Sequence, residues 1–450
     1  MDFDAFIKIL FQKAQQAGLQ EYEVYYSGGE RFGVTVFRGE IDRYQVAATA
    51  GISLRALYNG KMGYAFSEVL DEEAADMLVA SCIQNAQIVT KTDVDEIFAG
   101  SEAYVQAESY SQALGEVTPA QKIELAFALE NSGKQKNALV RDVQYCTVQS
   151  GEGMHRIVNS KGLNLSARSN YVVAMLAPII ETNGRMYDGS AYKATLDFDT
   201  LDADALAQEA VEDALHNIGA KPVPSGQYRI VFKQEAFCSL LAAFTGVLDA
   251  DNAQKGLSLL AGKEGETIAS TLVTLVDDPF MPEGLNITTF DGEGVATRKN
   301  VFIQNGVLQT LMHNLKTAKK AGVQTTGNGS RGVFSSQIGI TPFNLYIAPG
   351  TSTKQEILQV AEGGLYITEL NGLHAGTNAV SGDFSLNAKG FVIQNGQMAQ
   401  AVEEITIAGN FFELLKKIDY IADNLKMDMP SSACFGCPTL SVSSLAVAGI

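Results

Sequence analysis

Alternating apolar and polar residues in the first part of the chain constrain the fold most. They occur in the runs EVYYSG, GVTVFRGEIDRYQ and GISLRALYNGKMGYAFS, between residues 23 and 67. A period of two is typical of strands that bury one face. Asn59-Gly60 separates two such runs, and this dipeptide favours the tight turn of a two-residue hairpin. The pattern therefore predicts an antiparallel sheet.

Helical patterns accompany these strands. Residues 3–17 place their apolar side chains on one stripe, and further helices are predicted at 71–89 and 202–219. Thr118 begins another helix with a capping box, and Gly133 is expected just past its end. Strands and helices that are not interleaved one by one favour an α+β fold.

The segment AKPVPSG, residues 220–226, follows a predicted helix and precedes the strand QYRIVF. Two prolines and a glycine at such a place indicate a linker. A chain of 450 residues is also too long for one typical core. We expect two α+β domains. Residues 1–220 would hold an antiparallel sheet with flanking helices, and residues 221–450 a larger, curved, glycine-rich sheet with helices.

Turn and capping signals also organise the second half. The tripeptide Gln-Asn-Gly recurs in two predicted hairpins, at residues 300–313 and 390–402. A capping box predicts a helix at 354–362. Another helix, capped by Asn410, is predicted to continue through Ala422 on the spacing of its apolar residues.

Composition excludes some classes of function. The chain has 51 acidic and 33 basic residues, a formal net charge of −18, which disfavours direct binding to nucleic acid. Neither a signal peptide nor an apolar run long enough to cross a bilayer is evident. Five scattered cysteines do not form a disulfide framework. We expect a soluble, cytoplasmic protein that contacts no membrane.

Metal and nucleophile signals are weak. The four histidines, His155, His216, His313 and His374, are far apart, and structural or solvated roles are favoured for them. Cys434 and Cys437 have C-x-x-C spacing but no second pair, so inert thiols are favoured. The loops TTGNGSRG (325–332) and VSGDFS (380–385) are explained by turn formation, and G-x-S-x-G is absent. We therefore assign no catalytic residue and no metal ligand.

The clearest helix of the second half lies within residues 233–252. Its apolar residues recur at helical spacing: Phe237, Leu240, Leu241, Phe244, Val247 and Leu248. Between Glu235 and Asp249, only Cys238 could exchange a proton or bind a metal. This helix is predicted to be a core helix.

Several longer segments, taken in order, resemble one family. They are YEVYYSGGERFGVTVFRGEIDRYQ, GISLRALYNGKMGYAFS, LVDDP, DGEGVATRKNVFIQNGVL, TTGNGSR, NLYIAPG, GLYITELNG, AVSGDFS and EEITIAGN. Together they cover roughly residues 20 to 449 and identify the chain as similar to the TldD/PmbA family, historically named as modulators of DNA gyrase.

The resemblance also implies a branch of that family. TldD-like members carry His-Glu-x-x-x-His on the helix just described, which supplies two zinc ligands and a general base. The matching positions here are Leu241, Ala242 and Gly246. The chain is therefore most similar to the PmbA/TldE branch. The resemblance implies no cofactor in this chain and zinc in a TldD-like partner subunit.

The function implied is that of a non-catalytic partner subunit in a heteromeric zinc peptidase that cleaves unfolded or modified peptides. An extended peptide substrate would bind by strand addition to a sheet edge. Asn328, Asn378 and Asp383 are the candidates for lining its cleft.

Alternative functions stay open. The chain could be a non-proteolytic modulator that binds DNA gyrase or its peptide inhibitors, or a self-sufficient hydrolase whose residues converge only in the fold. Whether the chain itself is an enzyme is open, and the isolated chain could form a homodimer.

Overall fold

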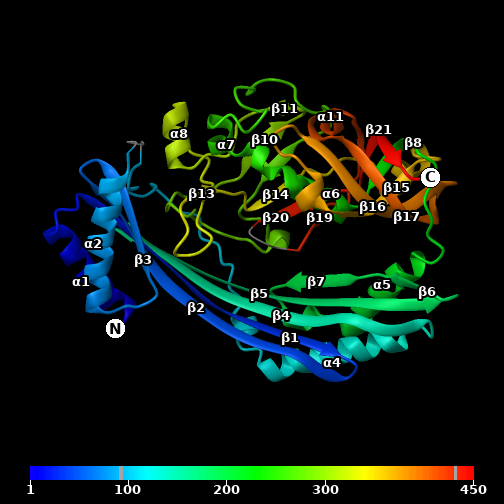
Figure 1. Cartoon of the computed structure of the whole chain (residues 1–450), viewed down its shortest axis with the longest axis horizontal. Helices are drawn as coiled ribbons and strands as arrows, with labels where there is room; N and C mark the ends of the chain where they lie inside the picture. Colours follow the sequence, from blue (N-terminus) through cyan, green and yellow to red (C-terminus); the bar gives the residue numbers. More distant parts are fainter. Residues whose placement is uncertain (91–94, 430–432) are drawn as a thin grey trace.

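The computed structural model describes residues 1–90, 95–429 and 433–450. A long sheet from the first half lies beneath the more compact second half (Figure 1). The sheets of both halves consist mainly of antiparallel pairs, with one parallel pair in each six-stranded sheet of the second half, and helices pack against them, so the predicted α+β class is confirmed. The division into domains at residues 220–226 stays a prediction.

The first half forms one seven-stranded sheet in the order β3-β2-β1-β4-β5-β6, with β7 also paired to β5. All its pairs are antiparallel. The strands are β1 (Glu21–Phe37), β2 (Glu40–Tyr58), β3 (Lys61–Ser67), β4 (Val140–Asn159), β5 (Asn164–Thr182), β6 (Arg185–Asp188) and β7 (Ala191–Thr195). The predicted turn is confirmed, since Asn59 and Gly60 have φ of 51° and 72°.

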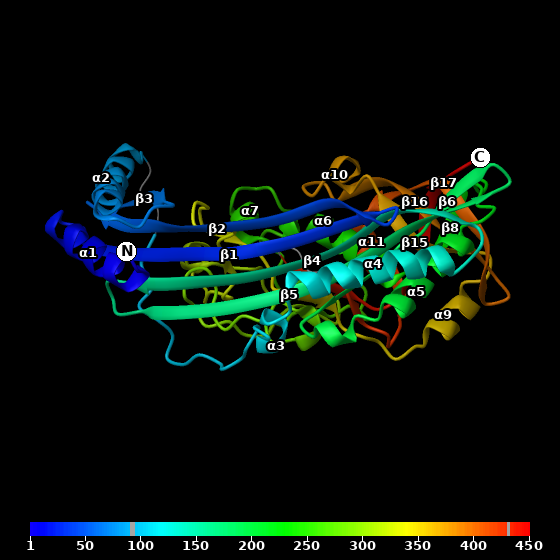
Figure 2. The same cartoon turned by 90° about the horizontal axis from the view of Figure 1, so that it is seen from below.

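Helices cover one face of this sheet at both ends (Figure 2). They are α1 (Phe3–Gln16), α2 (Glu72–Ile88), α3 (Gln112–Gly115), α4 (Pro119–Gln135) and α5 (Ala203–His216), with a 3-10 turn at Phe198–Thr200. The capping box at Thr118 is confirmed. The expected end at Gly133 is wrong, because α4 continues to Gln135. A Cβ at Gly133 would lie 2.8 Å from the Leu176 side chain, so close packing on β5 explains this glycine.

The second half contains two six-stranded sheets, in the orders β17-β16-β15-β8-β21-β18 and β11-β10-β9-β14-β20-β19, and a short β12-β13 pair. The strands are β8 (Gly226–Phe232), β9 (Leu275–Asp277), β10 (Asn300–Gln304), β11 (Val307–Leu308), β12 (Gly329–Ser330), β13 (Gly339–Ile340), β14 (Asn344–Ile347), β15 (Leu365–Asn371), β16 (Asp383–Gln394), β17 (Gln397–Asn410), β18 (Ile418–Ile421), β19 (Lys426–Met427), β20 (Cys434–Cys437) and β21 (Leu440–Ala448). Both Gln-Asn-Gly hairpins are confirmed, with Asn305 and Asn395 at φ of 49° and 53°.

The helices of the second half are α6 (Gln234–Phe244), α7 (Ala250–Gln254), α8 (Leu315–Ala321), α9 (Lys354–Val360), α10 (Leu373–Gly376) and α11 (Phe411–Lys416), with 3-10 turns at Thr245–Leu248 and Pro282–Gly284. The capping box of α9 is confirmed. The predicted continuation of α11 through Ala422 is wrong. Ile418 and Ile421 belong to β18, and a register irregularity in its pairing with β21 lets both side chains reach the core.

No helix in the described part of the chain is long and apolar enough to cross a membrane.

Candidate functional site

Helix α6 is buried in the core of the second half, and its chemistry is apolar. Leu241 is 3% exposed and borders a small, mainly apolar cavity of about 20 Å³ together with Phe411 and Leu415. Ala242 and Gly246 are half-buried and carry no polar side-chain atom. These three positions therefore do not fit a zinc ion, which needs nitrogen, sulfur or carboxylate ligands.

Cys238 lies on α6, and Cys434 and Cys437 lie on the neighbouring strand β20, but none of these thiols is suited to chemistry that needs a thiolate. The thiol of Cys238 donates a hydrogen bond to the carbonyl of Phe435, 3.5 Å away on β20. Burial raises the pKa of Cys434 to about 12 and that of Cys437 well above its ordinary value, so both stay protonated at neutral pH. No group of three His, Cys, Asp or Glu side chains suited to a metal occurs in residues 1–90, 95–429 and 433–450.

The histidines do not come together. His313 is buried, with Nδ1 3.2 Å from the Thr317 hydroxyl, and His216 is exposed on α5. The ring of His155 packs 5.1 Å from that of Phe290, and burial lowers the pKa of His155 to about 4. His155 is therefore neutral near pH 7.

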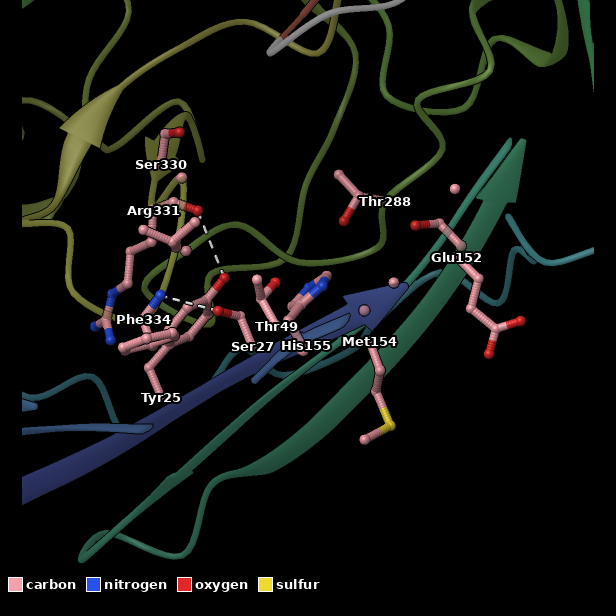
Figure 3. A pocket seen from close by; sticks show the side chains of 18 of the residues that line it. Tyr25, Ser27, Thr49, Glu152, Met154, His155, Thr288, Ser330, Arg331 and Phe334 are labelled. Atoms are coloured by element: carbon pink, nitrogen blue, oxygen red, sulfur yellow. Dashed lines mark hydrogen bonds between the residues drawn. The ribbon is translucent and has the colours of Figure 1, made fainter. Parts of the chain in front are cut away.

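A cavity with a volume of about 730 Å³ lies between the first sheet and loops of the second half. Strands β1, β2, β4 and β5 supply one wall, and segments 286–292, 329–334 and 341–343 supply the other. Figure 3 shows Tyr25, Ser27 and His155 near the sheet, with Ser330 and Arg331 on the opposite side.

Glycines keep the sheet side of this cavity open. Gly29 on β1 faces Gly153 on β4 in register. A Cβ at Gly29 would lie 2.4 Å from the Glu152 carbonyl oxygen, so a larger residue would displace the strand. The cavity therefore has a backbone-rich floor.

A loop of the second half clamps onto the sheet beside the cavity. The amide of Phe334 donates to the Ser27 hydroxyl at 2.9 Å, and the Tyr25 hydroxyl donates to the Arg331 carbonyl at 3.5 Å (Figure 3). The Phe334 ring covers Gly51 on β2, where a Cβ would approach it to 2.6 Å. These contacts hold the loop at a fixed distance from the sheet and so limit the width of the cavity between them.

Buried charges join the two halves next to this clamp. Arg331 pairs with Glu23 on β1, and its guanidinium lies 4.8 Å from the centre of the Tyr25 ring. Arg55 on β2 lies 3.2 Å from Glu23 and 3.9 Å from Glu293. We call Glu23, Arg55, Glu293 and Arg331 the junction network. Its members are at most 7% exposed, so each charge depends on the others for compensation.

Asp291 extends the junction network towards the cavity. Its carboxylate accepts hydrogen bonds from the amides of Glu293, Val295 and Gly329 at 2.8, 3.0 and 2.8 Å. Burial, together with the neighbouring charge of Glu293, raises the pKa of Asp291 above its ordinary value. The DGEG and TTGNGSR segments thus meet here.

Asn328, a predicted cleft residue, is fully buried and does not line the cavity. Its Nδ2 donates to Asp277 Oδ2 at 2.8 Å and to the Thr341 carbonyl at 3.2 Å. Asp277 Oδ1 accepts from the amides of Phe343 and Asn344, both at 2.9 Å, and burial raises the pKa of Asp277 to about 6. Asn328 therefore holds strand ends together.

Asn378 and Asp383 lie together, away from Asn328. The Asn378 amide donates to the Asp383 carbonyl at 2.8 Å. The Asp383 carboxylate accepts from Ser381 Oγ at 2.8 Å and Asn410 Nδ2 at 2.9 Å, and these bonds lower the pKa of Asp383. Both residues are exposed, and neither borders the large cavity. Their role in a substrate cleft stays a prediction.

Sequence reasoning missed the residues that shape the cavity, above all Tyr25, Ser27, Arg331 and Phe334. The TTGNGSR segment did signal a special loop. However, the partner of Arg331 lies 308 residues away at Glu23, and no local pattern indicates such a pairing.

Comparison with known proteins agrees with this architecture. Models of the PmbA/TldA metallopeptidase family match three parts of the chain: domain 1 at residues 22–86, the central domain at 113–218 and the C-terminal domain at 225–449. A metalloprotease of Methanothermobacter thermautotrophicus is 27% identical, covering 86% of this chain and 85% of the relative. Metalloprotease PmbA of Escherichia coli O157:H7 is 24% identical, covering 91% and 88%.

Solved structures show the same fold. A Thermotoga maritima protein, described as a candidate modulator of a DNA gyrase, superimposes with a TM-score of 0.92 at 32% identity, covering 99% of this chain and all of that one. TldE from Thermococcus kodakarensis gives a TM-score of 0.89 at 23% identity, with coverage of 99% and 100%. Fold and sequence thus define a class of metallopeptidase-related proteins. Within it, the chain belongs to the PmbA/TldA metallopeptidase family, which confirms the predicted resemblance to TldD/PmbA proteins.

Proposed function

We propose that this chain is the non-catalytic partner subunit of a TldD/TldE-type zinc peptidase that cleaves unfolded or modified peptides. The observation that carries the proposal is the apolar character of α6, where Leu241 borders an apolar cavity together with Phe411 and Leu415. Zinc and the general base would come from a TldD-like partner chain. The likeness to TldE, and relatives named as metalloproteases, support this reading.

The chain's own contribution is to hold the peptide. The large cavity is bounded by backbone-rich strands and by the clamp at Phe334. A wall of this kind admits an extended chain and excludes a folded one, because a folded domain is much wider than a single strand.

The test is to mix this chain with a TldD-like protein from the same organism. Cleavage of an unfolded peptide and zinc content are measured for each chain alone and for the mixture. We expect cleavage with the mixture, and zinc that follows the TldD-like chain. Replacing both ligand histidines of that chain by alanine should abolish cleavage.

A matched control acts on this chain. The double variant Cys434→Ser and Cys437→Ser should leave cleavage by the mixture unchanged, because these buried thiols are assigned no role. Stoichiometric zinc and cleavage by this chain alone would overturn the proposal. Absence of cleavage by the mixture, together with binding to gyrase or its peptide inhibitors, would favour the non-proteolytic alternative.

A further inference from the structure

A second cavity lies on the other side of the first sheet. It has a volume of about 290 Å³ and is formed by α3, the first turns of α4 and strands β1, β2, β4 and β5. Figure 1 shows α4 beneath the sheet, whereas the second half of the chain lies above it. We call this cavity the α4 pocket. Pockets that bind small molecules typically have volumes of about 300–1,000 Å³, so the α4 pocket has the size for a compound of few heavy atoms.

One wall of the α4 pocket is apolar. Phe32 on β1 and Leu114 on α3 are buried there, and Val46 on β2 is 49% exposed. Two hydrogen bonds of 2.8 Å between the Asn170 side chain and the backbone of Ser111 hold the start of α3 over the sheet. An apolar group of a ligand would be removed from water against this wall.

Lys122 supplies the pocket with a cation that has no carboxylate partner. Its Nζ donates to the Ser150 hydroxyl at 2.8 Å and lies 5.2 Å from the centre of the Phe32 ring. Within the described part of the chain, Lys122 forms no ion pair. Burial lowers the pKa of Lys122, against the opposing effect of the charges of Glu30 and Glu152. An anionic group brought to this half-buried amine would therefore be bound favourably.

The two carboxylates of the pocket differ in their partners. Glu152 accepts from the Tyr110 hydroxyl at 3.2 Å and lies 3.5 Å from Arg168. The carboxylate of Glu30, on the neighbouring strand, is exposed and has neither a hydrogen bond nor an ion pair with any described residue. The pocket thus holds one unpaired cation, Lys122, and one unpaired anion, Glu30, which do not pair with each other.

We propose that the α4 pocket binds a free α-amino acid with an apolar side chain, as its zwitterion. The ligand carboxylate contacts Lys122 and accepts from the Ser150 hydroxyl, which keeps its own proton to donate. The ligand ammonium group contacts Glu30, and its side chain packs on the apolar wall. A free amino acid carries both charges on one carbon atom, whereas a peptide carries them at opposite ends. This inference goes beyond the proposed function and does not depend on it, because it concerns binding by this chain alone.

The probe is L-leucine, and saturation-transfer NMR measures its binding to the full chain without a partner protein. Two charged contacts and one buried side chain should give a Kd no weaker than about 1 mM. Glycine should bind at least about tenfold more weakly, because it lacks the apolar side chain. Absence of binding at about 10 mM leucine, roughly tenfold above the limiting Kd, would overturn the inference.

Two analogues of leucine each remove one charge. Leucinamide lacks the carboxylate and should bind at least about tenfold more weakly, because the contact with half-buried Lys122 is lost. N-acetyl-leucine lacks the ammonium group and should bind about threefold more weakly, because Glu30 is exposed. These analogues also resemble the first and the last residue of a peptide. Binding of either one as tightly as leucine would show that the pocket takes a peptide end, and the inference would be wrong.

Lys122→Met tests the carboxylate contact from the protein side. This variant should bind leucine at least about tenfold more weakly and leave the weak binding of leucinamide unchanged. Lys8→Met, at an exposed lysine of α1, is the matched control and should bind leucine as the wild type does. Thermal denaturation checks that both variants fold. If Lys122→Met does not fold, the analogues with the wild-type chain decide the question.

Glu30→Gln tests the ammonium contact. Leucine should bind this variant about threefold more weakly, whereas N-acetyl-leucine should bind it at least as well as the wild type, because no ammonium group is present to lose a partner. Glu40→Gln, at an exposed residue of β2 outside the pocket, should change neither affinity. Equal weakening of leucine and N-acetyl-leucine by Glu30→Gln would contradict the proposed orientation and with it the inference.

Discussion

Helix α6 and the junction network are both largely buried, but they differ in chemistry. Positions 241, 242 and 246 of the α6 region carry no polar side chain, whereas the junction network consists of charged residues. Leu241 on α6 is enclosed by aromatic and aliphatic neighbours. Glu23 and Arg331 are just as inaccessible, yet they pair across the boundary between the halves. The contrast teaches that buried polar residues from several motifs can fasten two parts of a protein together, while the buried apolar residues of α6 pack within the core of one half.

The largest effect should come from breaking the junction network. Arg331→Met leaves the carboxylate of Glu23 with Arg55 as its remaining cation. Removing one partner of a buried ion pair typically costs about 3–5 kcal/mol of unfolding free energy. Urea denaturation measures this loss.

Glu413→Gln is the matched control for that experiment. It removes an exposed ion pair with Lys416, 2.9 Å apart, and should change the unfolding free energy by less than about 1 kcal/mol. Similar losses in both variants would show that the junction network is no more important than a surface pair.

The second test concerns α6. Leu241→Ala should lower the unfolding free energy by about 2–5 kcal/mol, because it enlarges an apolar cavity in a packed core. Leu257→Ala, at a side chain that is 47% exposed, should cost less than about 0.5 kcal/mol. If the Leu241 variant were as stable as the Leu257 variant, the apolar side chains of α6 would contribute little to core stability. The contrast between α6 and the junction network would then be wrong.

The third test uses pH. The pKa of Asp277 is raised from 3.8 to about 6 in the folded state, so the folded protein holds a proton that the unfolded chain releases. The stability contributed by this group is greatest below about pH 4 and declines towards pH 6, by at most about 1.4 kcal/mol per pH unit. Asp277→Asn should remove this slope from the unfolding free energy.

Asp383→Asn serves as the control of opposite sign. Hydrogen bonds lower the pKa of Asp383, so its contribution is present above the ordinary pKa and is lost as the pH falls through the lowered value. An unchanged pH profile for Asp277→Asn would mean that this carboxyl is not protonated preferentially in the folded state.

The smallest loss of unfolding free energy is expected at a site that contacts neither α6 nor the junction network. Thr118→Ala removes the capping box of α4 and should cost about 1 kcal/mol, whereas Thr118→Ser should restore most of it. Thermal denaturation of both variants sets a scale for the larger effects. A loss for Thr118→Ala as large as that for Arg331→Met would remove the distinction between local and junction contacts.

Features that depend on neighbouring residues were predictable. The Asn59-Gly60 turn, both Gln-Asn-Gly hairpins and the caps at Thr118 and Thr353 are confirmed, because each arises within a few residues. The predicted ends of two helices, α4 at Gly133 and α11 at Ala422, were wrong. Packing of Gly133 on β5 and pairing of β18 with β21 decide these positions, and both depend on residues distant in sequence.

The cavity and the junction network could not be read from the sequence. Asn328 and Arg331 stand in a loop that turn formation explains locally, whereas their partners Asp277 and Glu23 come from distant segments. The apolar residues of α6, in contrast, already indicated a core helix, because their spacing is local.

The pairing of Glu23 with Arg331 has a consequence for synthesis on the ribosome. The two residues are 308 positions apart. At roughly 5–20 residues per second, Glu23 emerges from the ribosome on the order of 15–60 s before Arg331. During that interval the nascent first half carries strand β1, near whose start the buried carboxylate of Glu23 has Arg55 but not yet Arg331 as a native cation. The first sheet must therefore reach its final stability late, and the growing chain is most exposed to aggregation and to chaperone capture before residue 331 is made.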